Sequence, residues 1–432
     1  MSNSKNNIAW KKLFEKYKIS EEVNEKGFYE ITSSAINEFR EARLMTKFDF
    51  KSQLPEIFSY NNFSILPVSR GSYIISDIDT FMDFENNETE IIKIDFPNYL
   101  ESIDFNNITS ESTALNCAYV SGIIEDFAQD EELKPTVSGR MSSLSFDFNI
   151  NSRKSLLNVN VNNSQIEIDG GYEGIETLNL IEAKNSISKD FLIRQVFYPY
   201  RLWENKVSKK VKSLFLIYSN GVFHFKEYAF EDPKHYNSIK LIREKKYAIR
   251  DGAINLELIQ KTLNQVRILE EPSIPFPQAD SFERVINLCE ILNSEVQISK
   301  IGLLENYDFR LRDSIDPRQV DYYVNAGRYL GLIDKTHVDG EVIYFLSNSG
   351  QELFNLSIVN RQLKFIELIL SHMVFNKVLK FYLKKSEAPR RDEIVKIMKE
   401  SNLYKVNSES TFKRRASTVS SWINWVLDQI EE

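Results

Sequence analysis

Two acids and a lysine stand near the ends of two apolar runs. Asp169 closes the run that begins at Gln165, and Glu182 and Lys184 close the run that begins at Leu178. Residues two apart on a strand point to the same face, so Glu182 and Lys184 would project together. If the two runs are neighbouring strands, two carboxylates and one ammonium meet. Carboxylate oxygens are the ligands that Mg²⁺ prefers, and a cation beside a lysine can activate water against a phosphodiester.

The setting of these residues is more informative than their spacing. Glu-x-Lys occurs four times in the chain, and only the copy at Glu182 follows an apolar, strand-like run. Ionised Glu and Lys are rarely placed inside buried strands unless they are paired or bind a metal. The alternative interpretation is a structural ion pair at a strand end, since structural pairs can imitate functional sites.

The elements around the three residues follow a regular order: a helix, three strands, a helix and two strands. Apolar spacing, a proline at 199 and a Ser-Asn-Gly turn predict these elements. Their expected ranges are a helix over 112–127, strands over 144–150, 157–169 and 178–184, a helix over 188–206, and a hairpin of 211–218 with 222–228.

This order, with one acid ending the second strand and another in the third, resembles the PD-(D/E)XK nuclease superfamily. Within it, the chain resembles type II restriction endonucleases over roughly residues 105–235. The resemblance implies an α/β (α+β) fold, a mixed sheet flanked by helices. It also implies that Asp169, Glu182 and the carbonyl of Ala183 bind Mg²⁺. Lys184 would orient or deprotonate the attacking water, which releases the 3′ oxygen and leaves a 5′ phosphate.

The chain departs from the family pattern in two places. Ile168, rather than proline, precedes the first acid, and that proline varies within the superfamily. Some members carry Gln-x-x-x-Tyr on the following helix, whereas Gln195 is followed by tyrosines at other spacings. Gln195 is therefore a candidate for binding the scissile backbone without the full motif. A third acid often comes from the helix before the strands, and the sequence does not choose among Glu111, Glu125 and Asp126.

Length and composition limit the remaining possibilities. A chain of 432 residues suggests two to four domains. It has no apolar run of 18 residues, so we expect neither a signal peptide nor a membrane span. Cys117 and Cys289 lie far apart among apolar residues, as expected for reduced thiols in a cytoplasmic protein. Four histidines without ligand spacing argue against a zinc site, and no glycine-rich phosphate loop supports ATP-driven action.

The net charge of −8 conceals an uneven distribution. Residues 361–420 contain 14 Lys and Arg against 6 Asp and Glu, so this block is basic within an otherwise acidic chain. A basic face on an acidic protein suits contacts with phosphates through chosen surfaces. The alternative is a solvated helical surface.

The region after the proline-rich boundary at 270–277 resembles a winged helix. Three helices are expected, over 282–292, 298–304 and 316–331, and a hairpin follows around Asp339-Gly340. In that fold the third helix enters the major groove, where it would present Arg318 and Gln319. Because this helix carries little net charge, a scaffold or dimerisation winged helix is an equal alternative.

A second winged-helix-like unit is expected over 360–432. Its last helix, over 408–430, carries hydroxyls and cations that suit phosphate and base-edge contacts. The residues that we expect to contact DNA are Thr411, Lys413, Arg414, Arg415 and Thr418. The alternative is a basic solvated helix that makes a dimer contact.

Four regions are expected: 1–105 of unclear role, a catalytic domain at 106–260, and winged-helix-like domains at 278–350 and 360–432. Together they suggest a Mg²⁺-dependent type II restriction endonuclease that acts on double-stranded DNA beside a cognate DNA methyltransferase. A palindromic target favours a homodimer, with a monomer acting on an asymmetric site as the alternative. Other PD-(D/E)XK nucleases, specific for modified DNA or for repair, remain open, as does a non-enzymatic winged-helix regulator.

Overall fold

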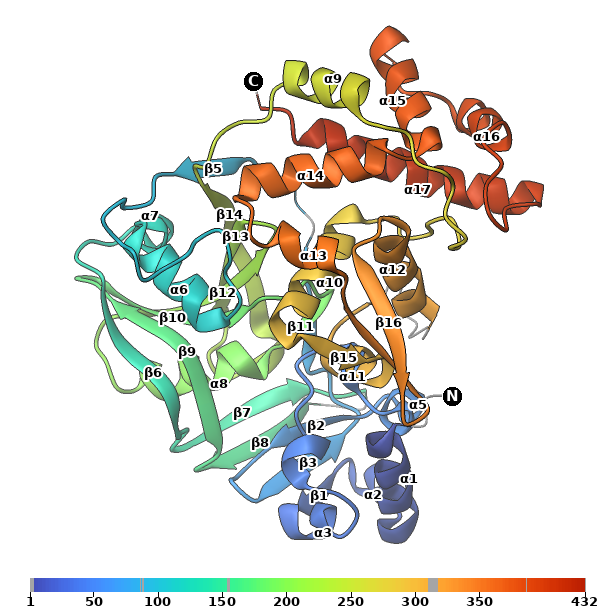
Figure 1. The fold of residues 1–432 in the computed structure, drawn as a ribbon. Helices are drawn as coiled ribbons and strands as arrows, with labels where there is room; N and C mark the ends of the chain where they lie inside the picture. Colours follow the sequence, from blue (N-terminus) through green and yellow to red (C-terminus); the bar gives the residue numbers. More distant parts are fainter. Residues whose placement is uncertain are drawn as a thin grey trace.

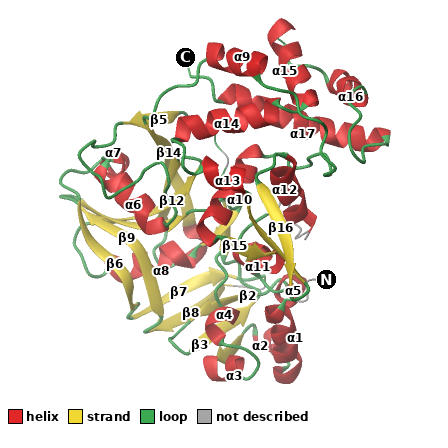
Figure 2. Cartoon of the chain, in the orientation of Figure 1, coloured by secondary structure: helices red, strands yellow, loops and turns green. Residues whose placement is uncertain are grey.

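A seven-stranded mixed sheet, here called the central sheet, occupies the left of the view in a computed structural model that describes residues 4–85, 87, 89–153, 156–309, 318–385 and 387–431 (Figures 1 and 2). The strand order is β5-β14-β13-β12-β10-β9-β6. β10 runs parallel to β12 and β14 parallel to β5, and the other neighbours are antiparallel. The fold is therefore mixed α/β. The strands are β5 (Ile91–Ile94), β6 (Lys134–Ser142), β9 (Gln165–Glu173), β10 (Thr177–Lys184), β12 (Lys210–Ser219), β13 (Val222–Phe230) and β14 (Ile239–Ile249).

Helices cover both faces of this sheet. α6 (Glu111–Val120) and α7 (Ile123–Ala128) share a core with Ile181 and Ala183 of β10. α8 (Arg194–Glu204) packs on the opposite face and forms the crossover that parallel pairing of β10 with β12 requires. Because both faces are covered, every residue of β10 is buried.

The structure divides the expected strands differently. The expected strand over 157–169 is two elements, β8 (Leu156–Asn162) and β9, which are separated near Asn163 with φ of 54°. β8 pairs only with β7 (Ser145–Asn151), and the two form a separate hairpin. The third strand of the central meander is β6, which the sequence did not reveal because it is a largely exposed edge strand without apolar alternation.

The two expected helices of this region are also divided. The helix expected over 112–127 is broken between α6 and α7 at Gly122, whose φ of 78° suits glycine. The start of the helix expected over 188–206 is the short strand β11 (Asp190–Leu192), which pairs with β4 (Phe81–Asp83). Pro199 lies inside α8. The hairpin of β12 and β13 agrees with the prediction.

A buried carboxylate fixes the turn between β9 and β10. Asp130 accepts hydrogen bonds from the backbone N–H groups of Glu176 and Thr177 and from the Thr177 hydroxyl. A Cβ at Gly174 would lie 2.4 Å from Asp130 Oδ2, so only glycine lets the acid approach this closely. These hydrogen bonds fix the register of β9 and β10 at the end of the pair that is remote from Lys184.

The N-terminal region forms a small sheet of order β1-β3-β2 packed with helices. The loop after α4 reaches the central domain, where Lys51 N–H donates to Asp190 Oδ1 and Leu192 N–H donates to the Asp49 carbonyl. Although we expected a separate region up to residue 105, β5 within it belongs to the central sheet. The elements are α1 (Lys5–Tyr17), α2 (Ile19–Lys26), β1 (Tyr29–Thr32), α3 (Ser33–Asn37), α4 (Ala42–Met45), η1 (Lys51–Gln53), α5 (Glu56–Asn61), β2 (Ser64–Pro67) and β3 (Ser72–Ser76).

The C-terminal region shares one hydrophobic core that extends from Ile254 to Val426 across both expected units. Its first part combines helices with a small sheet of order β15-β17-β16. The expected helix start at Asp316-Pro317 lies outside the described residues. The elements of this part are α10 (Phe282–Glu295), β15 (Gln297–Ser299), α11 (Lys300–Asn306), α12 (Arg318–Tyr329), β16 (Ile333–Val338) and β17 (Glu341–Leu346).

The second expected unit, 360–432, contains helices and no strand within the described residues 360–385 and 387–431. This stretch therefore does not form a second winged-helix-like unit. Its helices complete the hydrophobic core of the first C-terminal unit. The helices after β17 are α13 (Asn348–Leu353), α14 (Ile358–Leu370), α15 (Met373–Lys385), α16 (Arg391–Lys399) and α17 (Glu409–Asp428), and α9 (Leu256–Gln265) packs against α14 (Figure 1).

Two expectations drawn from composition can be compared with the structure. Cys117 and Cys289 are both buried and unbridged. Across the described stretches, no helix combines the length and apolarity that crossing a membrane would need.

Candidate active site

The open end of the β9–β10 pair brings the two predicted acids together. Backbone pairing of these strands stops at Gly170 opposite Ile181, and one further step of that register places Asp169 opposite Glu182. Asp169 Oδ2 accepts a hydrogen bond of 2.8 Å from the N–H of Ala183. The Asp169 side chain therefore supplies the next hydrogen bond between the two strands after their backbone pairing ends.

The side chains of Glu182 and Lys184 lie on the same face of β10, at its C-terminal end. Lys184 Nζ lies 2.6 Å from Glu182 Oε1, and Gln195 Nε2 of α8 donates to the same oxygen at 2.5 Å. The convergence of Asp169, Glu182 and Lys184 that the sequence predicts is thus present, and the structure adds Gln195 to it. Their chemical roles remain predictions.

Two further carboxylates face the lysine. Glu111, the first residue of α6, lies 3.7 Å from Lys184 Nζ, and Asp49 lies 4.0 Å from it. Of the three eligible helix acids, the structure brings only Glu111 to the site, since Asp126 pairs with Lys245 and Tyr247.

Asp49 is the site residue that sequence reasoning missed. It stands 120 positions before Asp169 in the N-terminal region, on a loop with no motif. The available signal was an acid between Phe48 and Phe50, both of which are buried. An acid between two buried aromatic residues on a short loop is itself held close to the core.

The electrostatics of the cluster follow from one ammonium among four carboxylates. Burial would lower the pKa of Lys184, but Glu182, Asp49 and Glu111 raise it well above its ordinary value. Burial raises the pKa of Glu182 to about 8, and Asp169 adds to this against the attraction of Lys184. Burial likewise raises the pKa of Asp169 and of Glu111. Four carboxyl groups therefore face one ammonium, and protonation of Glu182 below about pH 8 relieves part of their mutual repulsion.

The C-terminal region holds the loop that follows Lys184. Asn287 of α10 accepts a hydrogen bond from the Ile187 N–H and donates one to the Asn185 carbonyl. Asp308 Oδ2 accepts from the Lys189 N–H at 2.9 Å. The open end of β10 is thus fixed by residues about a hundred or more positions away.

Several buried polar atoms beside the cluster have no protein partner. They include Gln195 Oε1, both amide atoms of Asn185 and the Ser188 hydroxyl. Buried polar groups are nearly always hydrogen-bonded in folded proteins. Such atoms are ordinarily satisfied by ordered water, and similar ones occur elsewhere in the chain, among them Tyr323 Oη and Trp425 Nε1.

The residues present fit a hard cation in part. No group of three His, Cys, Asp or Glu side chains arranged to hold a metal occurs in the described portion of the chain. Asp169 and Glu182 supply two carboxylates, and the Ala183 carbonyl lies just beyond the end of the β9 ladder. Mg²⁺ keeps several waters and needs only one or two protein carboxylates. The crowding of carboxyl groups around one lysine is consistent with such a site.

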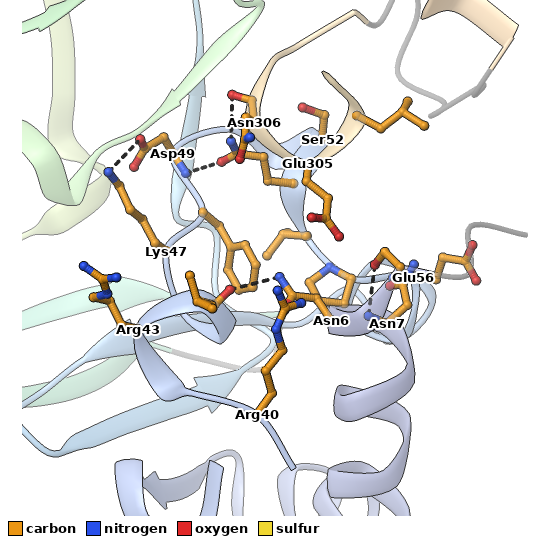
Figure 3. A pocket seen from close by; sticks show the side chains of 17 residues that line it. Asn6, Asn7, Arg40, Arg43, Lys47, Asp49, Ser52, Glu56, Glu305 and Asn306 are labelled. Atoms are coloured by element: carbon orange, nitrogen blue, oxygen red, sulfur yellow. Dashed lines mark hydrogen bonds and ion pairs between the residues drawn. The ribbon is translucent and has the colours of Figure 1, made fainter. Parts of the chain in front are cut away.

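Cavities flank the cluster on two sides. The larger, of about 560 Å³, is lined by Asp49 and by residues of α4, η1 and α11 (Figure 3). The smaller, of about 280 Å³, is lined by Glu111 and Asn185. The acid–lysine cluster therefore lies between two hollows rather than in a sealed core.

The expected DNA-contacting residues are not all at the surface. Gln319 is buried in α12, and Thr418 is fully buried and donates to Asp280 Oδ1 at 2.7 Å. The prediction that these two contact DNA is wrong, because a polar residue on a helix can bond within the core. Arg415 donates to Gln278, and the Thr411 hydroxyl lies 2.8 Å from Ser408 in the helix cap. The side chains of Arg318, Lys413 and Arg414 are exposed.

Three family models match successive stretches of the chain. Residues 7–75 match a domain of unknown function, DUF6996; residues 76–248 match another, DUF6997; and residues 284–431 match a third, DUF7226. The searches of curated proteins and of solved structures find no match. The first boundary falls at 75–76 rather than at the expected 105, and the third model spans both expected C-terminal units. The cluster draws Asp49 from the first stretch and its other members from the second.

Proposed function

We propose that this chain is a Mg²⁺-dependent endonuclease of the PD-(D/E)XK superfamily that cleaves double-stranded DNA at a specific sequence, as type II restriction enzymes do. The observation that carries the proposal is the convergence of Asp169, Glu182 and Lys184 at one end of β10, with Glu111 and Gln195 beside them. A structural ion pair would not need four carboxylates around one lysine.

The topology supports the same proposal. The order α6, β6, β9, β10, α8, β12 is a helix, an antiparallel meander, and a crossover helix leading to a parallel strand. This order is typical of the PD-(D/E)XK core, and the acids lie on its second and third strands. The β7–β8 hairpin is an insertion between the first two strands of that meander.

The chain's own groups suit hydrolysis of a phosphodiester. Mg²⁺ held by Asp169, Glu182 and the Ala183 carbonyl would polarise the scissile phosphate and acidify a nearby water. Because its raised pKa keeps Lys184 protonated, Lys184 orients the water and offsets charge on the phosphate rather than accepting a proton. The oxygen of the water joins phosphorus, the bond to the 3′ oxygen breaks, and that oxygen gains the proton the water loses. Gln195 steadies Glu182 from α8.

The C-terminal region suits DNA recognition. α10, β15, α11, α12, β16 and β17 follow the order of a winged helix, with a three-stranded sheet of order β15-β17-β16. Exposed cations on α15, α16 and the start of α17 supply a basic face that includes Lys413 and Arg414. We propose a cytoplasmic homodimer that acts on double-stranded DNA beside a cognate methyltransferase, with Arg318 and this basic face in contact with DNA.

Cleavage of unmethylated phage DNA with and without Mg²⁺ tests the proposal. Lys184→Ala is compared with Lys226→Ala, which removes another buried lysine from the same sheet, one paired with Glu244. We expect discrete Mg²⁺-dependent fragments with 5′ phosphates from the wild type and from the folded control, and none from Lys184→Ala. Cutting by Lys184→Ala would refute the site. DNA binding without cutting would favour a nuclease for modified DNA or a winged-helix regulator.

A further inference from the structure

The larger cavity beside the site has one basic wall. Arg40, Arg43 and Lys47, all from the segment around α4, line it from the N-terminal region, and Glu305 and Asn306 of α11 line the opposite side (Figure 3). Nothing in the proposed nuclease core requires three cations here. The presence of these three cations therefore needs a separate explanation.

Two amide side chains of the cavity, Gln53 and Asn6, are already engaged, whereas the buried Ser52 hydroxyl has no protein partner. Gln53 accepts from the N–H groups of Asp49 and Phe50 and donates to the Asn306 carbonyl. Asn6 accepts from Arg40 and donates to the Leu44 carbonyl. The amides thus build the walls and leave little capacity to read a base or a sugar.

Two of the three cations, Arg43 and Lys47, are by contrast weakly engaged, while Arg40 donates to Asn6. Arg43 lies 3.4 Å from Glu41, and both side chains are more than half exposed. Lys47 lies 3.9 Å from Asp49 and is 72% exposed. Exposed ion pairs of this kind contribute little and exchange readily for a stronger anion. A phosphate is such an anion, since it offers several charged acceptors to Arg and Lys.

The position of the wall relates it to the proposed chemistry. Asp49 lies between Lys47 and Lys184, at 3.9 and 4.0 Å from their ammonium groups. The backbone around Asp49 is fixed, because its carbonyl accepts from the Leu192 N–H just before α8. The ammonium groups of Lys47 and Lys184 thus face the same oxygen, Asp49 Oδ2, which places Lys47 beside the acid–lysine cluster on its N-terminal side.

We infer that Arg40, Arg43 and Lys47 bind backbone phosphates of the nucleic-acid strand next to the phosphate that is cut, so that the N-terminal region forms part of the substrate channel. This inference rests on the proposed nuclease function and assigns a role to a region that the nuclease core leaves without one. Glu305 on the facing wall repels the strand and confines it to the basic side.

The salt dependence of DNA binding tests this inference. Fluorescence anisotropy of a labelled duplex, without Mg²⁺, compares the wild type with Arg43→Ala plus Lys47→Ala. The matched control is Lys12→Ala plus Arg70→Ala, which removes two exposed cations of the same region outside the cavity. We expect the slope of log Kd against log salt to fall by roughly 0.9 for each phosphate that the protein no longer neutralises, and only in the cavity variant. A duplex with a neutral methylphosphonate beside the cleaved bond should bind the wild type more weakly, and it should weaken the cavity variant less.

The outcomes separate this inference from the proposed function. If the wild type cuts DNA but the cavity variant keeps its slope, the inference fails and the nuclease stands. If the wild type neither binds nor cuts DNA, both fail. Thermal shift with inorganic phosphate and with a mononucleotide is the remaining arm. Stabilisation of the wild type but not of the cavity variant, with the DNA slope unchanged, would assign the cavity to a small anion and overturn the inference.

Discussion

The two ends of the β9–β10 pair carry buried acids of opposite character. At the closed end, Asp130 accepts four hydrogen bonds, from the Glu131, Glu176 and Thr177 N–H groups and the Thr177 hydroxyl. Burial would raise the pKa of Asp130, but these bonds outweigh it and the pKa is lowered. At the open end, Asp169 and Glu182 have fewer donors, and burial raises the pKa of both.

The contrast is the one expected between a carboxylate that only stabilises the fold and one that binds a ligand. A fully hydrogen-bonded acid stabilises the fold and has no spare capacity for a ligand. A buried acid with a raised pKa and like-charged neighbours costs stability and gains it back when a cation or substrate arrives. Burial alone does not distinguish them; the number of donors around the carboxylate does.

The largest expected effect is on cutting. Asp169→Asn removes one charge from the open end while its amide oxygen can still accept from Ala183 N–H. We expect the cleavage rate to fall by about a thousandfold or more, as when a key electrostatic group is removed. We also expect no loss of folding stability, because the remaining acids repel each other less. Rates under single-turnover conditions and urea unfolding measure the two effects, and a marked loss of stability would mean that Asp169 is structural like Asp130.

Asp130→Asn should behave in the opposite way. Its new amide would face N–H donors at the closed end, and we expect the free energy of unfolding to fall by about 2–3 kcal/mol. Cutting at a temperature where the variant stays folded should keep nearly the wild-type rate. Urea unfolding and cleavage assays at low temperature check both, and a selective loss of cutting would contradict the division between the two ends.

The pH dependence of stability should have opposite signs at the two ends. Glu182 holds its proton up to about pH 8 when folded and loses it near its ordinary value of 4.5 when unfolded. Stability from this group is therefore present below pH 4.5 and is lost as pH rises through 8. The lowered pKa of Asp130 gives stability that is present above its unfolded pKa and lost as pH falls through the lower folded value.

Unfolding measured in EDTA at about pH 7 and about pH 8 tests this difference. We expect the wild type to lose stability over this interval and Glu182→Gln to lose less. Replacing EDTA with Mg²⁺ should reduce this loss of stability in the wild type only. Equal behaviour of the two proteins would show that Glu182 is not the group responsible.

The smallest expected effects come from two residues of α17, the buried Thr418 and the exposed Arg414. Thr418 bonds to Asp280 in the core, so Thr418→Val should lower stability by about 1 kcal/mol and leave DNA affinity unchanged. Arg414 is exposed, and Arg414→Ala should lower the salt slope of DNA binding by roughly 0.9. Urea unfolding measures the first effect and anisotropy titrations the second. A DNA defect in Thr418→Val alone would restore the interpretation of α17 as a helix that reads DNA through its hydroxyls.

Much of the fold follows from periodicity in the sequence. The β12–β13 hairpin, α10 and α17 agree with the prediction because their apolar residues recur at strand or helix spacing. β6 was missed because an exposed edge strand needs no apolar face, and the division between β8 and β9 depends on one backbone angle at Asn163. The packing of α13 to α17 on the first C-terminal unit is a tertiary outcome that no local pattern specifies.

The site was predictable to the extent that strand geometry determines it. Alternation along β10 and the antiparallel register sufficed to bring Asp169, Glu182 and Lys184 together. Glu111 could not be chosen among its neighbours, and Asp49 comes from a loop whose position depends on how two regions pack. The errors at Gln319 and Thr418 have one cause, which is that sequence does not show which face of a helix is covered.

The hydrogen bonds that join Asn287 and Asp308 to the loop after Lys184 can form only late in synthesis of the chain. While the chain is being synthesised, the strand end that carries Lys184 exists long before the residues that hold its loop. At about 5–20 residues per second, the interval from residue 184 to residue 308 takes roughly 6 to 25 seconds. A nascent chain therefore carries Asp169, Glu182 and Lys184 before the residues that fix the loop after them have been made. For a protein with the proposed activity, such a delay would keep unfinished chains harmless inside the cell that makes them.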